Sequence, residues 1–335
     1  MTSQRENRVV RTVPLGKTGL TVSPIGLGLA ALGRPAYINL ERDRDLGDSR
    51  SVESMSRRSH DVLDAALAAG IHYFDTARSY GYAERFLSEW LEARAVEAGT
   101  VTVGSKWGYE YVGDWRMDAG THEVKDHSVA MLERQYGESR RLLGRHLALY
   151  QIHSATLETG VLDDPGVLAR LAAIRDEGRA VGLSLSGPGQ SATLERALSV
   201  TARGVNLFST VQATFNLLEP SAADMLEAAH QAGWGVIVKE ALANGRLTDH
   251  EDPPDPVLAE VADRHDSTVD AVALAWVLGH EFVDVVLSGA VTTSQLHSNV
   301  AAAELDLSAP DRAALQTLRE EASEYWATRG ALRWA

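Results

Sequence analysis

Short apolar runs typical of strands alternate along this chain with longer Ala- and Leu-rich segments whose apolar residues recur at helical spacing. Strands that alternate with helices indicate a parallel sheet with helical crossovers. Eight such units over about 280 residues predict a closed (β/α)8 barrel. The strands are predicted at residues 24–29, 71–75, 100–106, 148–153, 180–186, 205–212, 235–239 and 283–288. The helices are predicted at residues 56–69, 83–98, 126–143, 161–177, 191–200, 221–232, 255–264, 267–278 and 293–303.

A doubly wound sheet that binds a dinucleotide is the alternative for this pattern. That fold usually has fewer strands, and its first strand leads through a Gly-rich phosphate turn directly into a helix. The segment Ile25-Gly-Leu-Gly-Leu lacks the third glycine, and no helical pattern follows it at once. We therefore expect residues 1–335 to form a single α/β barrel domain, with the (β/α)8 TIM barrel itself at about 24–305.

The segments outside the alternating units predict additions to the barrel. Val9–Val13 and Leu20–Val22 flank a Gly-containing turn, which indicates a β-hairpin before the first barrel strand. Residues 34–57 are charged and aperiodic and are expected to form a loop or partly ordered excursion. Residues 107–125 are expected to form a second long loop. The segment after Ser308, with a proline near its start, predicts a C-terminal helix.

Composition excludes several classes of protein. The chain has 335 residues, of which 44% are hydrophobic and 23% charged, and it has no cysteine, which excludes disulfides, thiolate metal sites and a cysteine nucleophile. The formal charge of −14 argues against nucleic acid as a partner. The polar first residues lack a signal-peptide pattern, and no apolar run reaches the ~18 residues of a membrane helix. The protein is expected to be cytoplasmic.

Polar residues at the ends of three predicted strands are candidates for chemistry, because barrel enzymes place their active sites at the carboxyl ends of the strands. Asp75, Lys106 and His153 end the second, third and fourth strands, and Tyr80 follows the second. Taken singly, Asp75 could cap a helix, Tyr80 could pack in its loop and His153 could be a core histidine. A lysine that ends an apolar strand must reach water or find an anion. Together, the four side chains are expected to meet at one mouth of the barrel.

This set of side chains suits the reduction of a carbonyl group. The pKa of a tyrosine lies near ~10, and a neighbouring ammonium favours the phenolate and lowers that pKa. We expect Asp75 to pair with Lys106, and His153 to donate a hydrogen bond to the substrate oxygen. Tyr80 would then give a proton to the oxygen while hydride reaches the carbon.

The sequence resembles a known family, the aldo-keto reductases, which are NAD(P)-dependent (β/α)8-barrel enzymes. The resemblance runs from about residue 11 to 305 and implies that the family's catalytic tetrad falls on Asp75, Tyr80, Lys106 and His153. The matching stretches are residues 14–28, 70–77, 79–84, 104–106, 149–153, 182–184, 212–218 and 288–290, followed by Gln295 and Asn299.

The resemblance also implies a nicotinamide cofactor bound at the last strands. Lys239 stands where an aromatic residue usually stacks on the nicotinamide, and Leu185 where an asparagine is common. Gly289 and Gln295 stand where many members carry the Lys and Arg that bind the 2′-phosphate, which leaves NAD possible. Some branches of the family with Gln still use NADP, so the resemblance favours NADP. The predicted cofactor-binding residues are Ser184, Gln212, Lys239, Ala241, Leu242, Gly245, Arg246, Ser288, Gly289, Ala290, Gln295 and Asn299.

The resemblance implies an oxidoreductase that reduces an aldehyde or ketone, or that oxidises the corresponding alcohol or sugar. The alternative is a regulatory, cofactor-sensing barrel with little turnover, akin to the family's channel-associated subunits. A small-molecule carbonyl compound or sugar is the expected partner. No metal site is predicted, because His122 and His127 lack a convincing ligand set. The aromatic residues that could line a substrate pocket are Trp107, Tyr109, Tyr111, Trp115, Tyr325, Trp326 and Trp334.

Overall fold

Eight parallel strands close into a barrel in the computed structural model, which describes residues 12–40, 42–47, 49–250 and 253–334. The strands follow one another around the barrel in chain order, and all neighbours pair in parallel, so the predicted (β/α)8 barrel is confirmed. The barrel strands are β3 (Ile25–Gly28), β4 (Tyr73–Asp75), β5 (Thr102–Trp107), β8 (Leu147–Ala155), β9 (Ala180–Leu185), β12 (Thr210–Thr214), β13 (Gly235–Lys239) and β14 (Val285–Ser288).

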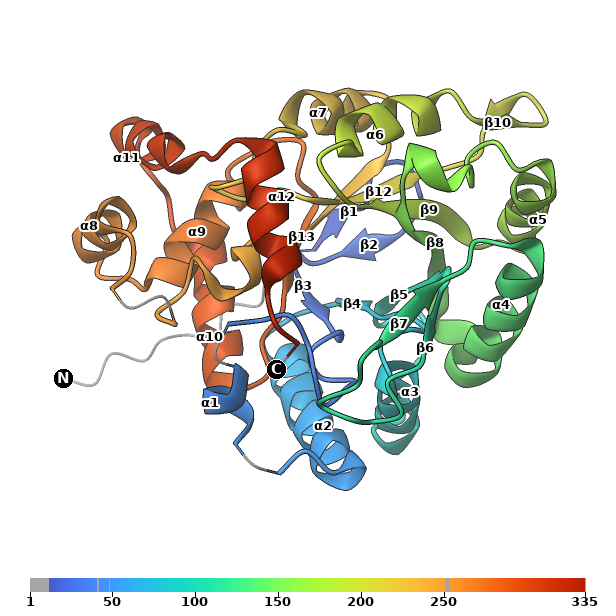
Figure 1. Cartoon of the computed structure of the whole chain (residues 1–335), viewed down its shortest axis with the longest axis horizontal. Helices are drawn as coiled ribbons and strands as arrows, with labels where there is room; N and C mark the ends of the chain where they lie inside the picture. The colour runs from blue at the N-terminus through green and yellow to red at the C-terminus, as the bar shows by residue number, and fades with distance from the viewer. Residues whose placement is uncertain (1–11, 41, 48, 251–252, 335) are drawn as a thin grey trace.

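Helices surround the barrel (Figure 1). Several begin at capping residues that the sequence places just before them; Ser128, for example, accepts the backbone N–H of Met131 at the start of α4. The helices are α1 (Arg42–Leu46), α2 (Val52–Ala68), α3 (Ala83–Ala93), α4 (Val129–Leu143), α5 (Pro165–Asp176), α6 (Gln190–Leu198), α7 (Ala223–Gln231), α8 (Pro256–Arg264), α9 (Val269–Leu278), α10 (Thr293–Ala301), α11 (Ala309–Leu315) and α12 (Ala322–Ala331). Short 3-10 turns are η1 (Gly144–His146), η2 (Leu157–Thr159), η3 (Ala243–Gly245), η4 (Ala302–Glu304) and η5 (Gln316–Leu318).

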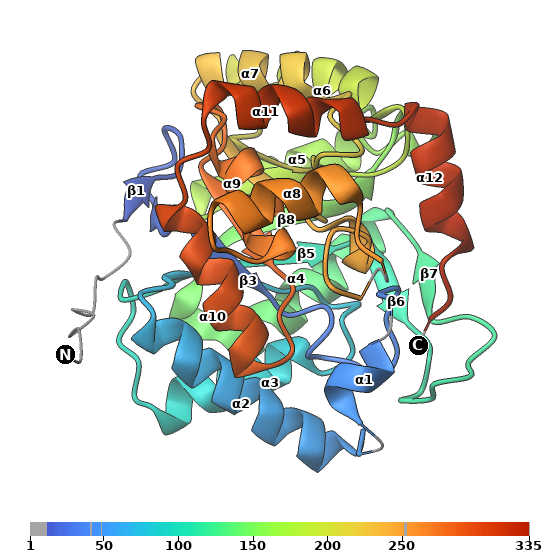
Figure 2. The same cartoon turned by 90° about the vertical axis from the view of Figure 1, so that its left-hand side faces the viewer.

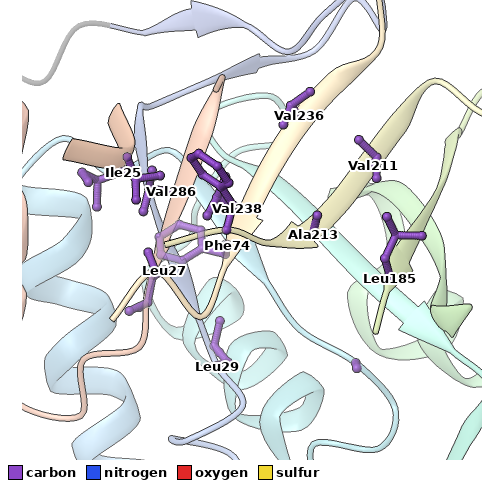
Figure 3. Close-up of a cluster of buried hydrophobic side chains, with 14 of the residues drawn as sticks. Ile25, Leu27, Leu29, Phe74, Leu185, Val211, Ala213, Val236, Val238 and Val286 are labelled. Atoms are coloured by element: carbon purple, nitrogen blue, oxygen red, sulfur yellow. The ribbon is translucent and has the colours of Figure 1, made fainter. Parts of the chain in front are cut away.

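The alternation of side chains along the strands divides the core into two parts. Outward side chains such as Val236 and Val238 belong to the large apolar cluster between barrel and helices (Figure 3). Inward side chains such as Tyr73 and Ile237 form a second, smaller cluster inside the barrel. Asp75 and Lys239 lie two residues further along the same strands. They are therefore on the inner side, one layer closer to the carboxyl end.

The predicted N-terminal hairpin is present and closes the opposite end of the barrel. Strand β1 (Val13–Pro14) pairs antiparallel with β2 (Thr21–Val22), and Leu15 and Val22 pack onto the inner cluster. Gly16 has φ +49°, and a Cβ there would lie 2.4 Å from the backbone N of Gly235. Only glycine permits this approach. Residues 9–11 of the predicted first arm lie outside the described residues.

The structure of four segments differs from the prediction. The 34–57 segment contains α1 and the start of α2, because Ser51 caps α2 and moves its first residue to Val52. The 107–125 segment is not only a loop, since β6 (Tyr109–Tyr111) and β7 (Glu123–Lys125) form a hairpin in it. The strand predicted from 205 begins at Thr210.

The residues before Thr210 form a second hairpin, of β10 (Thr201–Ala202) and β11 (Val205–Asn206). The segment after Ser308 is broken into α11, η5 and α12 rather than forming one helix. Its last part places the C-terminus beside β6 and β7 (Figure 2). Among the described residues, no helix is long and apolar enough to cross a membrane.

Candidate active site

A cavity of about 830 Å³ opens at the carboxyl ends of the barrel strands. Its wall includes Asp75, Tyr80 and His153 together with residues from β13, β14, α9, α10 and the C-terminal segment. Three of the four predicted catalytic residues therefore face one space. The fourth, Lys106, is buried directly behind them.

Asp75 and Lys106 form a buried ion pair. Lys106 Nζ contacts Asp75 Oδ1 and donates a second hydrogen bond of 2.9 Å to the carbonyl of Thr76. The other carboxylate oxygen, Oδ2, accepts hydrogen bonds from Gln212 Nε2 at 2.8 Å and from the Tyr73 hydroxyl at 3.2 Å. Because both charges are almost completely buried, each depends on the other and on these neutral donors.

Tyr80 and His153 lie side by side above this pair. The Tyr80 hydroxyl is 3.4 Å from His153 Nε2, and Lys106 Nζ lies 4.9 Å from the centroid of the Tyr80 ring. Ser79 Oγ lies 3.3 Å from the other ring nitrogen of His153. Burial, followed by the positive charge of Lys106, holds the pKa of His153 well below its ordinary value. His153 is therefore a neutral imidazole at pH 7.

The pKa of Tyr80 shifts in the direction opposite to the one predicted. It is raised well above its ordinary value, first by burial and then by the negative charge of Asp75. The charge of Lys106, which is paired with Asp75, does not outweigh this rise as expected. The cation that opposes the rise is Arg34. Tyr80 is therefore protonated at neutral pH.

Arg34 is a residue of the site that no sequence pattern indicates. Its guanidinium is buried and lies 5.2 Å from the Tyr80 ring centroid, 4.8 Å from that of Tyr37 and 4.7 Å from that of Trp334. It also forms an ion pair of 2.7 Å with Glu123 on β7. These residues come from segments far apart in the chain, so no local pattern could reveal the cluster.

The predicted aromatic wall of the cavity is only partly present. Of the four aromatic residues at 107–115, only Tyr109 lines it. Trp107 is buried against His127, and Trp115 stacks on Tyr82 at 4.9 Å, so both pack the loop instead. At the C-terminus, Trp334 lines the cavity and lies parallel to His122 at 4.4 Å.

All the predicted cofactor-binding residues except Ser184 and Arg246 line the cavity. The Ser184 hydroxyl accepts the backbone N–H of Ser154 at 2.8 Å. The Arg246 guanidinium pairs with Glu320. Both side chains are thus held in the protein around the cavity wall.

The end of the cavity near α10 is polar and hydrogen bonded. Asn299 accepts a hydrogen bond of 2.7 Å from Ser288 Oγ and donates one of 2.8 Å to Asp270, which also accepts from Ser298. The Gln295 side chain accepts the backbone N–H of Val291 at 3.0 Å, and Thr292 caps the helix.

Two features of this wall fit an elongated polar ligand such as a dinucleotide. Asn244 Oδ1 is buried and has no hydrogen-bond partner among the described residues, and a Cβ at Gly289 would meet none of their atoms within 4 Å. The helix start at Thr293 adds backbone N–H groups suited to a phosphate. Within the described ranges, no group of three or more His, Asp or Glu side chains could hold a metal ion.

Comparison with known protein sequences shows which family this chain belongs to. A sequence model of the Aldo/keto reductase family matches residues 24–320. Among curated proteins, the aldo-keto reductase str7 of Strobilurus tenacellus is 27% identical and covers 92% of this chain and 93% of its own. Pyridoxal 4-dehydrogenase of Microbacterium luteolum is also 27% identical and covers 85% and 91%.

Solved structures give the same result. A putative aldo-keto reductase from Pseudomonas aeruginosa is 28% identical, with a TM-score of 0.63 and coverage of 90% of this chain and 98% of its own. The holo form of AKR11C1 from Bacillus halodurans shares the fold, with a TM-score of 0.68 at 23% identity and coverage of 93% and 97%. Members of this family are oxidoreductases that act on carbonyl compounds and generally use nicotinamide cofactors. The chain belongs to the aldo/keto reductase family.

Proposed function

We propose that this protein is an enzyme that reduces an aldehyde or ketone with a nicotinamide cofactor, and that it can run the reverse oxidation of an alcohol or sugar. The observation that carries the proposal is the meeting of Tyr80 and His153 on the wall of one cavity, with the Asp75–Lys106 pair behind them. A ligand oxygen placed between the Tyr80 hydroxyl and His153 Nε2 would contact both.

Tyr80 is the proposed general acid. Burial keeps it protonated at neutral pH, so it has a proton to give to the developing alkoxide. His153 is neutral, and its Nε2–H can donate a hydrogen bond that orients the same oxygen. In the oxidation direction Tyr80 receives the proton, by microscopic reversibility.

Lys106 and Asp75 are the proposed support for Tyr80. The ammonium lies beside the phenol ring and would stabilise the phenolate that remains after proton transfer. Asp75 keeps the ammonium in place, and Gln212 and Tyr73 hold Asp75 through its second oxygen. The ion pair with Asp75 therefore holds the Lys106 ammonium in place behind Tyr80 and keeps it charged.

The residues proposed to hold the cofactor extend from Gln212 and Leu242 to α10. The bound nicotinamide would supply the hydride or accept it. Asn244 and the backbone at Gly289 would contact its polar groups, and the start of α10 would face a phosphate. Ser184 and Arg246 would act on the cofactor only indirectly, Ser184 through the backbone of Ser154 and Arg246 through Glu320.

NAD is the proposed cofactor, the reverse of the order favoured from the sequence. A 2′-phosphate needs a cationic partner to add affinity. At the end of the cavity near α8, α9 and α10, the lining residues that the structure describes include Asp263 and Asp270 but no lysine or arginine. Gln295, at the position proposed for the selector, already accepts a backbone N–H. Carboxylates there would repel a 2′-phosphate but could accept a ribose hydroxyl.

The regulatory alternative predicts cofactor binding with little turnover. The assembled quartet supports turnover instead. The test is depletion of NADH and of NADPH, followed by absorbance, across a panel of aldehydes, ketoses and sugars. At least one carbonyl compound should give sustained turnover. Tight cofactor binding with no turnover on any of them would favour the regulatory alternative.

A further inference from the structure

We propose that Lys239 recognises an anionic group, a carboxylate or a phosphate, on the carbonyl substrate. This inference rests on the proposed function, because it concerns the same cavity. It differs from the prediction that Lys239 contacts the cofactor, and it names a substrate class that the family match leaves open.

The position of Lys239 follows from the strand that carries it. Ile237 points into the barrel, so Lys239, two residues later at the end of β13, lies on the inner side at the mouth. It lines the same cavity as Tyr80 and His153. In the closed order of strands, β13 lies across the barrel from β5, which carries Lys106. An ammonium thus faces the candidate acid from the opposite wall.

The carboxylate next to Lys239 is already occupied. Glu240 accepts hydrogen bonds of 2.8 and 3.1 Å from Arg329 Nε and a further contact from Arg329 Nη2. It also accepts one of 3.2 Å from Thr214. Lys239 Nζ lies 3.8 Å from Glu240, beyond hydrogen-bond length, and its one hydrogen bond within the described part of the chain goes to Thr214 Oγ1 at 2.8 Å. Glu240 therefore lies between two cations, holds Arg329 through hydrogen bonds, and can neutralise only one of their two charges.

Two other cations at this part of the cavity, Lys106 and Arg34, are buried, and each has a carboxylate of its own. Lys106 pairs with Asp75, and Arg34 pairs with Glu123. Among these described side chains, the two pairs and the group of Lys239, Glu240 and Arg329 leave one positive charge in excess. Arg329 is hydrogen bonded to Glu240 and Lys239 is not, so Lys239 is the cation left to bind a ligand anion.

An ammonium in this setting is incomplete without an anion. It has three N–H donors and, among the residues that the structure describes, uses one of them, on the neutral Thr214 hydroxyl. Its side chain is only 16% exposed, so water cannot fully replace the missing partner. Burial lowers the pKa of Lys239 to about 8, and the shared charge of Glu240 does not offset this effect. A ligand anion would supply that partner and keep the amine charged.

The neighbours of Lys239 favour the substrate as the source of the anion. The charge of Lys239 acts on His153, where it lowers the pKa after Lys106 does. Lys239 thus lies near the site proposed for the carbonyl oxygen, whereas the polar network of Ser288, Asn299 and Asp270 lies further along the wall. A compound whose carbonyl reaches Tyr80 can therefore place a second group at Lys239.

Matched pairs of aldehydes test the inference. Succinic semialdehyde and butanal differ by a carboxylate, and glyceraldehyde 3-phosphate and glyceraldehyde differ by a phosphate. The wild type should prefer the anionic member of at least one pair. In Lys239→Met, the ratio of kcat/KM for the anionic over the neutral member should fall by about tenfold or more, through KM. Lys239→Arg should restore most of the ratio. Lys17→Met, a lysine at the other end of the barrel, should leave it unchanged.

Cofactor affinity distinguishes an anionic group on the substrate from a phosphate of the cofactor as the ligand of Lys239. The Kd of NADH and of NADPH, measured by protein fluorescence in wild type and Lys239→Met, should agree within about twofold. A Kd that weakens tenfold with an unchanged substrate ratio would assign Lys239 to the cofactor and overturn the inference. Equal losses on both members of each pair would also overturn it.

A binding measurement keeps the inference testable if no aldehyde is turned over. Succinate and inorganic phosphate should bind wild type and Lys239→Arg, and should bind Lys239→Met at least tenfold more weakly, by calorimetry with the folded proteins. Such a result without turnover would support the anion site and contradict the proposed reductase activity. Absence of any difference between wild type and Lys239→Met would overturn the anion site.

Discussion

Gln212 on β12 donates a hydrogen bond of 2.8 Å across the barrel to Asp75 on β4. The bond joins opposite walls and holds the carboxylate oxygen that Lys106 does not contact. Asp75 is therefore fixed by a charged donor on one oxygen and by neutral donors on the other. This network lies directly beneath Tyr80 and makes the candidate site depend on a buried charge pair.

Lys106→Met should destabilise the fold by about 3–5 kcal/mol, because it leaves the Asp75 carboxylate buried without its partner. Urea unfolding measures this change. The double variant Asp75→Asn with Lys106→Met removes both charges and should recover most of the loss. A single variant within 1 kcal/mol of wild type would contradict the dependence of Asp75 on Lys106.

The same variant should move the alkaline limb of the reduction rate to higher pH. The charge of Asp75 raises the pKa of Tyr80, and without Lys106 it is no longer balanced. A higher pKa keeps the phenol protonated, and able to act as an acid, at higher pH. The residual activity of Lys106→Met, measured from pH 6 to 11, would show this. A limb that moves to lower pH would contradict it.

Stability should fall as the pH drops below about 6.5. Burial lowers the pKa of His127 to about 4, while its ordinary value is 6.5. Between these values the unfolded chain binds the proton and the folded chain does not, so stability is lost as pH falls. At pH 5 the loss is about 2 kcal/mol. Urea unfolding at pH 7.5 and 5 would show a smaller loss in His127→Gln. Equal losses in both proteins would remove His127 from this role.

Trp334→Ala should loosen the C-terminal segment over the cavity. It removes the stack on His122 and the contact with the Arg34 guanidinium, each worth about 0.5–1.5 kcal/mol. We expect KM to rise several-fold, with a smaller change in kcat. Steady-state kinetics on wild type, Trp334→Phe and Trp334→Ala would test this, with the phenylalanine variant intermediate. An unchanged KM in Trp334→Ala would show that this contact does not shape the site.

Gln295→Arg should shift cofactor preference toward NADP, by about 1.5–3 kcal/mol if a charge-assisted hydrogen bond to the 2′-phosphate forms. Wild type should bind NAD more tightly than NADP. Fluorescence titration of both cofactors against both proteins measures the two ratios. A strong NADP preference in wild type that the substitution leaves unchanged would show that the selector lies elsewhere.

Much of the fold could be predicted from the sequence, because strand and helix periodicities are local. Every barrel strand was located, and the alternation along β4 and β13 explains why Asp75 and Lys239 share the inner side with Tyr73 and Ile237. The boundaries failed where tertiary pairing decides them, as in the β6–β7 hairpin, whose partner strands are twelve or more residues apart.

The site was predictable only in part. Asp75, Lys106 and His153 could be found because each lies at or near the carboxyl end of a strand, and these ends meet at one mouth. Arg34 and Glu123 could not, because their ion pair joins two segments without regular spacing. The pKa of Tyr80 was misjudged for a related reason. The sequence shows that a lysine is near, but not that burial and Asp75 outweigh its charge.

Turnover by Tyr80→Phe tests the central claim most directly. The substitution removes the hydroxyl near His153 and keeps the ring against Arg34 and Lys106. We predict that kcat falls by about 10²–10⁴, the usual contribution of a positioned general acid, while the cofactor Kd and the melting temperature stay close to wild type. Undiminished turnover in the folded Tyr80→Phe protein would show that the proton comes from another group.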